Sequence, residues 1–140
     1  MFARPAPTPE WRNTLSFLFG RVVATFPEPT KAIELLESRL EHATAEDAGL
    51  LLVMTDAALV LTGKGITLRS ESVARLQRLL LDAMMGPASV AVRADVGSAV
   101  GRIGDPRFRT DRLWLPADEQ LGFVEVAAGP FTMEIGRAHV

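Results

Sequence analysis

The stretch from Val92 to Pro106, VRADVGSAVGRIGDP, marks the point where the chain changes from helical to extended sequence patterns. Its larger apolar residues recur at the spacing of one helical face. Gly104 supplies a left-handed stop at the end of this helix, and Pro106 prevents the helix from resuming. The apolar face consists of Val92, Val96, Ala99, Val100 and Ile103. A second face with almost no side-chain bulk, which we expect to allow close helix packing, consists of Ala94, Gly97 and Gly101.

Four more helices are predicted upstream, each beginning at a capping residue, and three of them end at a glycine or proline. The third opens with Thr44 and Asp47 in a variant capping box and is apolar nearly all round, so we expect it to be the most buried. Their starts are Pro9, Thr30, Thr44 and Ser70. The face of the first helix expected to meet the core consists of Leu15, Leu18, Phe19, Val22, Val23 and Phe26.

Five helices joined by short turns over residues 9–104 predict an all-α fold of antiparallel helical hairpins. Residues 1–8 are rich in proline and residues 105–121 have neither helical nor strand period, so both are predicted linkers. Residues 123–126 alternate as a strand does, and a turn follows. We therefore expect an array of about five helices with an extended C-terminal tail that carries one strand or hairpin.

The composition excludes several classes of partner and chemistry. A chain of 140 residues with 48% hydrophobic residues can bury one modest core. A net charge of -2 gives no electrostatic reason to expect nucleic acid or a membrane surface as a partner. The third helix is too short to span a bilayer and carries Asp56 in its middle. The absence of cysteine excludes disulfides and zinc sites built on sulfur, and it is compatible with a cytoplasmic protein.

The sequence shows no catalytic constellation, and we predict no cofactor and no metal site. Asp56 is either functional or, as we favour, the partner of a neighbouring turn or of an arginine such as Arg93. Gly63-Lys64-Gly65 resembles a phosphate loop but lacks its first glycine and the Ser or Thr after the lysine, which favours an ordinary helix-ending turn. Structural roles are predicted for Asp56, Arg93, Gly97, Gly101 and Asp105.

The last predicted helix resembles the second helix of a HEAT repeat. The resemblance rests on Val92-Arg93-Ala94, on Ala99-Val100 and on Ile103-Gly104-Asp105, with an arginine early in the helix. It implies a HEAT-like array of stacked hairpins, for which an irregular helical bundle is the alternative.

Residues 122–133, GFVEVAAGPFTM, resemble the opening strand and turn of the formylglycine-generating, sulfatase-modifying-factor family. Ala127 stands where that family usually has proline, and Glu134 where it has glycine. The residues that carry the resemblance are Phe123, Val124, Gly129, Pro130, Phe131 and Met133. Residues 134–140 resemble the translation of a sequencing adaptor, with a natural polar tail as the alternative.

The resemblance implies a place in a larger bacterial protein. In such proteins a NACHT or related STAND-type NTPase lies upstream, and a helical segment leads into the formylglycine-generating domain. Members that oxidise a sulfatase cysteine use their own cysteines far downstream of the opening strand. The resemblance therefore implies a neighbouring activity, with the adjacent domains of the same parent chain as partners.

Three functions remain open from the sequence. The favoured one is a non-catalytic scaffold between the NTPase and the formylglycine-generating-like domain. The runner-up is a stand-alone helical-repeat module that binds a protein or peptide. The third is a small independent enzyme, which requires titratable residues clustered in a pocket.

Overall fold

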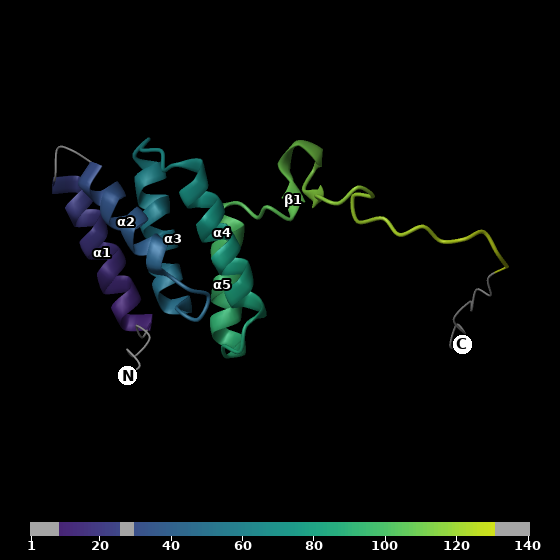
Figure 1. Cartoon of the computed structure of the whole chain (residues 1–140), viewed down its shortest axis with the longest axis horizontal. Helices are drawn as coiled ribbons and strands as arrows, with labels where there is room; N and C mark the ends of the chain where they lie inside the picture. The colour runs from purple at the N-terminus through teal and green to yellow at the C-terminus, as the bar shows by residue number, and fades with distance from the viewer. Residues whose placement is uncertain (1–8, 26–29, 131–140) are drawn as a thin grey trace, which may run out of the picture. The chain divides into compact units, whose positions relative to one another are not determined.

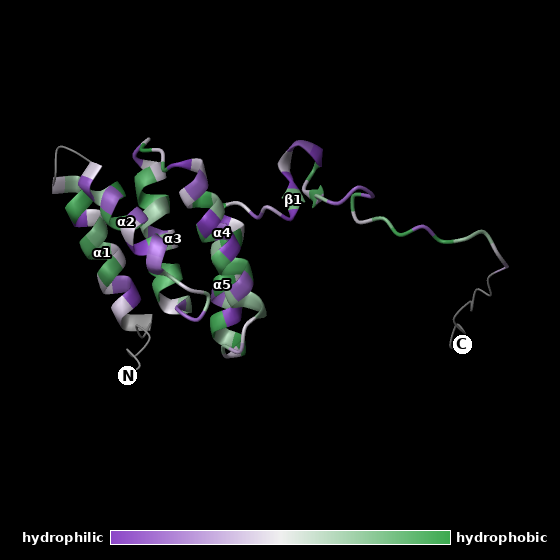
Figure 2. Ribbon diagram, viewed as in Figure 1, coloured by the Kyte–Doolittle hydropathy of each residue, from purple (hydrophilic) through white to green (hydrophobic). Residues whose placement is uncertain are grey.

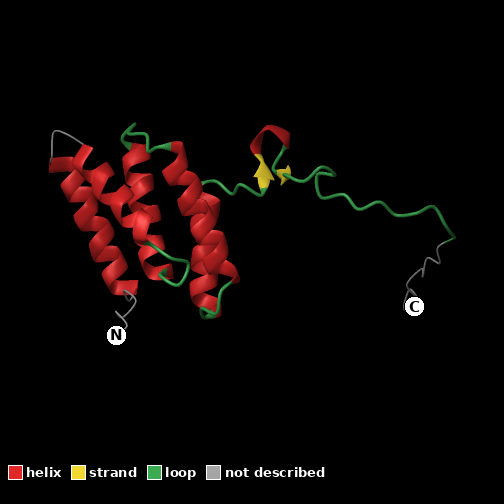
Figure 3. Ribbon diagram, viewed as in Figure 1, coloured by secondary structure: helices red, strands yellow, loops and turns green. Residues whose placement is uncertain are grey.

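The computed structural model describes residues 9–25 and 30–130 and divides the chain into two units, Met1–Pro106 and Arg107–Val140. Within the described residues, the first unit holds five α-helices and the second holds one short antiparallel strand pair (Figures 1 and 3). The predicted all-α fold with a strand hairpin in the C-terminal tail is confirmed. The predicted linker 1–8, the adaptor-like residues 134–140, and Phe131 and Met133 of the family phrase lie outside the described residues.

The helices of the first unit alternate in direction along the chain (Figure 1). Their bounds are Pro9–Thr25 for α1, Thr30–His42 for α2, Ala48–Gly63 for α3, Ser70–Met85 for α4 and Val90–Ile103 for α5.

These helices form two layers. Helix α3 lies between α1 and α5 and contacts both, while α2 lies beside α4. Across the layers, α2 packs on α3 and α4 packs on α5. Neighbours within a layer are thus two helices apart in sequence, and partners across the layers are consecutive. This is the arrangement of stacked helical hairpins, with α1, α3 and α5 as the inner layer and α2 and α4 as the outer layer.

The core follows α3 and the helices that cover it. Helix α3 has more buried residues than any other described helix, which confirms the prediction from its apolar run. Figure 2 shows hydrophobic residues along α3. None of the described helices is long and apolar enough to cross a membrane. The largest fully buried side chains are Leu40, Leu51, Thr55, Leu61, Leu76, Leu80, Val96 and Val100.

Helix α3 begins later than predicted. Thr44 does not cap it; Asp47 is the N-cap residue and the helix starts at Ala48. The Asp47 carboxylate accepts hydrogen bonds from the Thr44 backbone N–H at 3.1 Å and the Thr44 hydroxyl at 2.9 Å. The Thr44 side chain is thus used within the turn that precedes the helix, which moves the helix start by one turn.

The prediction for the buried face of α1 is wrong in part. Val23 is buried and Phe19 is half-buried, but Leu15, Leu18 and Val22 are exposed. Helix α1 turns Arg12 and Ser16 toward α3, because both bind the Asp56 side chain there. A carboxylate held in a helical interface needs such partners, and they rotate α1 away from the orientation that hydropathy alone favours. Phe26 lies outside the described residues.

The predicted apolar face of α5 is confirmed, but the predicted close packing of its small residues is wrong. Val96, Ala99 and Val100 are buried, and Ser89 caps the helix by accepting a hydrogen bond from the Val92 backbone N–H at 3.4 Å. The predicted stop at Gly104 has φ +99°, a conformation that favours glycine.

The small face of α5 is open rather than closely packed. A Cβ added at Gly97 would lie 3.6 Å from the Met84 sulfur, and one added at Gly101 would meet no atom of the described residues within 4 Å. Ala94 is exposed. Gly101 therefore has no role in close packing, and the contact at Gly97 is an ordinary one.

The second unit forms its hairpin in residues predicted to be a linker. Strand β1 (Phe108–Arg109) pairs antiparallel with β2 (Leu115–Pro116), and a 3-10 turn over Thr110–Arg112 joins them. Leu113 and Trp114 then take positive φ angles of 54° and 60°. Because these residues are not glycine, their sequence gives no signal for such a turn.

Residues 123–126, predicted to be a strand, pair with no other strand in the described part of the chain. Phe123, Val124 and Val126 are exposed by 70% or more. The alternating pattern is present, but a strand is stabilised by cross-strand pairs, and this segment has none.

Candidate functional site

Asp56 lies at the meeting point of the three inner-layer helices. Its side chain, 16% exposed, accepts hydrogen bonds from Arg12 Nε at 3.0 Å and Ser16 Oγ at 3.1 Å, both on α1. Arg102 Nη2 on α5 donates to its other carboxylate oxygen at 2.9 Å. The prediction that Asp56 binds an arginine is right in kind, but the partner is not Arg93, which is exposed. We call Asp56, Arg12, Ser16 and Arg102 the Asp56 cluster.

The electrostatics of the cluster favour the charged form of the Asp56 carboxylate at neutral pH. Burial acts to raise the pKa of Asp56, but the hydrogen bonds from Arg12, Arg102 and Ser16 and the positive charge of Arg12 together outweigh it and hold the pKa below its ordinary value. A general acid or base works best with a pKa near the operating pH, so this shift is in the wrong direction for proton transfer. The arrangement instead ties α1 and α5 to α3 through charge-assisted hydrogen bonds.

A second cluster joins the outer-layer helices and was missed from the sequence. Glu37 of α2 is only 8% exposed; its carboxylate accepts from Ser72 Oγ at 3.0 Å and pairs with Arg69 Nε at 3.2 Å. Arg75 of α4 donates to the last turn of α2, at the Leu40 carbonyl oxygen. These contacts satisfy a helix C-terminus and set a carboxylate beside a helix N-terminus, both favourable for the helix dipoles.

We call Glu37, Arg69, Ser72 and Arg75 the Glu37 cluster, and it borders a small cleft of about 150 Å³. Three of its charged side chains are already paired: Glu37 with Arg69, and Arg75 with the backbone carbonyl oxygens of Leu40 and Glu41. The lining residues are Glu37, Leu40, Glu41, Arg69, Glu71, Ser72 and Arg75.

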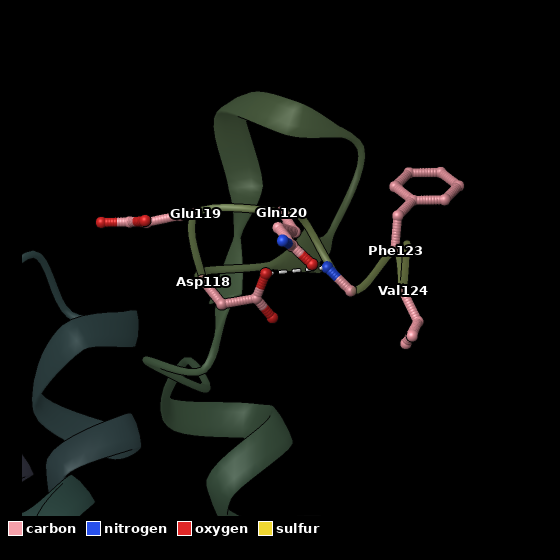
Figure 4. A pocket seen from close by; sticks show the side chains of 6 residues that line it. Asp118, Glu119, Gln120, Phe123 and Val124 are labelled. Atoms are coloured by element: carbon pink, nitrogen blue, oxygen red, sulfur yellow. Dashed lines mark hydrogen bonds between the residues drawn. The ribbon is translucent and has the colours of Figure 1, made fainter. Parts of the chain in front are cut away.

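The second unit contains an open hollow of about 440 Å³ beside a turn (Figure 4). Asp118 Oδ1 accepts a hydrogen bond from the Gly122 backbone N–H at 2.9 Å and so closes the turn. In Figure 4, Glu119 points away from Phe123 and Val124, which project from the other end of the turn. Because these side chains diverge, the hollow presents no group of atoms aimed at one ligand.

The other positions singled out from the sequence lie at helix ends. Asp105 is half-buried and follows Gly104, the C-cap residue of α5. Lys64 follows the end of α3, where its backbone N–H donates to the Leu61 carbonyl oxygen, so the Gly63-Lys64-Gly65 sequence is a helix-ending turn. No group of three or more His, Cys, Asp or Glu side chains suited to a metal occurs among residues 9–25 and 30–130.

An apolar face on α1 was not predicted as a surface. Trp11, Leu15, Leu18 and Val22 are 61%, 38%, 51% and 41% exposed. They follow one another at spacings of four, three and four residues, so they form one stripe along the helix. We call these four residues the α1 face. Their periodicity was visible in the sequence, but which side of α1 meets the core was not.

Comparison with models of known protein families, with curated proteins and with solved structures finds no match for this chain.

Proposed function

We propose that this chain is a non-catalytic helical scaffold within a larger bacterial protein. In this proposal it links an upstream NACHT or STAND-type NTPase region to a downstream domain of the formylglycine-generating type. A cytoplasmic location is part of the proposal and agrees with the absence of cysteine.

The observation that carries the proposal is how the buried charges of the helical unit are used. The Asp56 cluster joins three inner-layer helices, and the Glu37 cluster joins the two outer-layer helices. In the described residues, every buried side-chain nitrogen or oxygen has a hydrogen-bond partner. Charged side chains that pair between helices fix the position of one helix against the next, as a rigid spacer requires.

The division of the chain gives further support. The helical unit ends at Pro106, and the segment that resembles the opening of the formylglycine-generating domain lies in the second unit. Gly129 and Pro130 of that segment are exposed, as are Phe123 and Val124. Exposed residues after the helical unit are what we expect of a scaffold that continues into another domain.

The experiment for this proposal is to sequence the genomic locus on both sides of the reading frame. We expect an NTPase upstream and, after Met133, codons that continue a formylglycine-generating-type domain with glycine at the next position. A promoter directly before Met1 together with a stop codon directly after Val140 would contradict the proposal.

A second candidate function is favoured by the α1 face. Four apolar side chains in one exposed stripe are typical of a surface that receives another helix. As a helix-binding module, the chain would act through α1 rather than through its connections to neighbouring domains.

A further inference from the structure

The two-layer array leaves one inner-layer helix without an outer-layer partner. Helix α2 covers α3, and α4 covers α5. In the described part of the chain no helix stands in the corresponding position on α1, whose main contacts are with α3. The α1 face, from Trp11 to Val22, spans about 17 Å of helix, or three turns, at the rise of an α-helix.

The α1 face has the spacing of a helix-pairing seam. Spacings of four, three and four residues place side chains along one line when a second helix packs alongside. Phe17 is more exposed than any of the four, at 68%, but it lies on the opposite flank of α1. The exposed apolar residues of α1 are therefore divided between an ordered stripe and a single outlying side chain.

Helix α2 extends the same surface. Its Glu37 side chain binds Arg69 and Ser72 at the α4 end, so that flank of α2 faces α4. Leu35 is two residues away, about 200° around the helix, and therefore lies on the flank turned away from α4. It is 55% exposed. Figure 1 shows α2 between α4 and α1, so this flank faces the α1 end of the array.

The charged residues nearest this surface are basic. Lys31 and Arg39 of α2 are exposed and lie four residues on either side of Leu35. On α1, exposed Arg21 borders the stripe next to Val22. A helix seated on the α1 face would thus meet positive charge on both of its sides, which favours acidic residues there.

We propose that the α1 face binds an acidic amphipathic helix supplied by a partner protein, seated beside α2 as a third outer-layer helix. The inference deepens the second proposed function, helix binding, and rests on it. Residues 1–8 are fewer than the 13 residues of α2 and contain two prolines, a sequence that disfavours a helix of that length. The present outer helices indicate the apolar pattern of the partner, with buried residues Ala32, Leu36 and Leu40 in α2 and Leu76, Leu80 and Ala83 in α4.

The probe is a synthetic peptide of 21 residues with leucine at heptad spacing and glutamate beside the leucines. Two controls have the same length: a peptide with lysine in place of glutamate, and a scrambled peptide without the periodicity. Binding to the full chain is followed by peptide fluorescence anisotropy at 50 mM and 300 mM NaCl. A Trp114→Phe background leaves Trp11 as the one tryptophan, so a blue shift of its emission reports contact at the α1 face.

Matched variants locate the contact. The double variant Leu15→Gln/Leu18→Gln removes the centre of the stripe with residues that favour helices, and we expect Kd to rise at least tenfold. Phe17→Gln, on the opposite flank, should change Kd less than twofold. Arg39→Glu should weaken binding about fivefold at low salt, while Arg93→Glu, the same charge change on α5, should leave it unchanged. Circular dichroism checks that each variant keeps its helix content.

Four results would overturn the proposal. The first is equal binding of the acidic, basic and scrambled peptides, and the second is an equal loss in the Phe17 and Leu15/Leu18 variants. The third is an absence of binding both for the free acidic peptide and for the same peptide tethered to the N-terminus, where its effective concentration reaches the millimolar range. The fourth is a dimer in sedimentation velocity that the Leu15/Leu18 variant abolishes, because the occupant is then a second copy.

The source of the helix is tested on the longer reading frame from the genomic locus. If an upstream segment of that frame already blocks peptide binding, the occupant belongs to the same chain and the partner-protein source is wrong. Failure of the peptide experiments leaves the scaffold proposal intact, since that proposal depends on the identity of the flanking domains.

Discussion

Replacing Asp56 with asparagine tests whether the Asp56 cluster holds the inner layer together. Asparagine keeps the size of the side chain but removes its charge. A charge-assisted hydrogen bond such as the one from Arg12 at 3.0 Å is worth about 1.5 kcal/mol. The pair with Arg102, whose side chain is 47% exposed, is worth about 0.5 kcal/mol because solvent screens it. We therefore expect Asp56→Asn to lower the free energy of unfolding by about 2 kcal/mol.

The assay is urea unfolding of the full chain at pH 7, followed by far-UV circular dichroism. Asp95→Asn is the matched control, because Asp95 lies 3.8 Å from Arg12 in the same region but is 60% exposed. We expect this control to change the free energy of unfolding by less than about 0.5 kcal/mol. Equal effects of the two substitutions, or no effect of either, would refute the assignment of Asp56 as an interhelical tie.

The pH dependence gives the same test a definite sign. The folded pKa of Asp56 is lowered, so its contribution is present above the unfolded pKa of about 3.9 and is lost as pH falls through the folded value. The difference in stability between the parent chain and Asp56→Asn should be constant from pH 7 to about pH 5 and should shrink below about pH 4. A difference that grows on acidification would contradict the pairing.

Two further predictions concern the core and the glycines of the last helix. Leu80→Ala, at a fully buried position, should lower the free energy of unfolding by about 3 kcal/mol, whereas Val90→Ala at a 74% exposed position should change it by less than about 0.5 kcal/mol; urea unfolding measures both. Gly101→Ala should raise the melting temperature, because its Cβ meets open space and alanine favours a helix by about 0.5 to 1 kcal/mol. Gly104→Ala should lower the melting temperature, because alanine at φ +99° costs about 1 to 2 kcal/mol of folding free energy. If calorimetry gave Gly104→Ala the higher melting temperature of the two variants, the end of α5 would be wrongly placed.

The sequence was sufficient for the helices, because their signals are local. Apolar periodicity and capping residues located α5 between Ser89 and Gly104, and the continuous apolar run identified α3 as the most buried helix. The start of α3 was misplaced, since Thr44 and Asp47 can bond to each other in a turn as well as across a helix start. Such local alternatives differ too little in energy for the sequence pattern to separate them.

The orientation of α1 and the partners of Asp56 could not be predicted from local sequence patterns. Arg102 is 46 residues from Asp56, and Arg12 is 44 residues from it, so nothing in the neighbouring sequence connects them. Hydropathy predicted that Leu15 and Leu18 would be buried, and the need to pair a carboxylate in the interface turned them outward instead. The same rotation created the α1 face, which is why that surface could not be predicted.

In the C-terminal tail, a strand-like sequence pattern did not predict which residues form strands. Residues 123–126 have the period of a strand, but pairing requires a neighbour that the described residues do not supply. The hairpin formed instead by Phe108–Arg109 and Leu115–Pro116 turns through Leu113 and Trp114, whose positive φ angles no turn motif indicates.

The most direct test of the account is removal of residues 107–140. If Met1–Pro106 is a self-contained helical scaffold, the shortened chain should keep its helix content per helical residue in far-UV circular dichroism. Its free energy of unfolding in urea should lie within about 0.5 kcal/mol of that of the full chain, as for changes away from a core. Loss of helix, or a decrease of more than about 2 kcal/mol, would show that the tail is part of the helical fold and would contradict the division at Pro106.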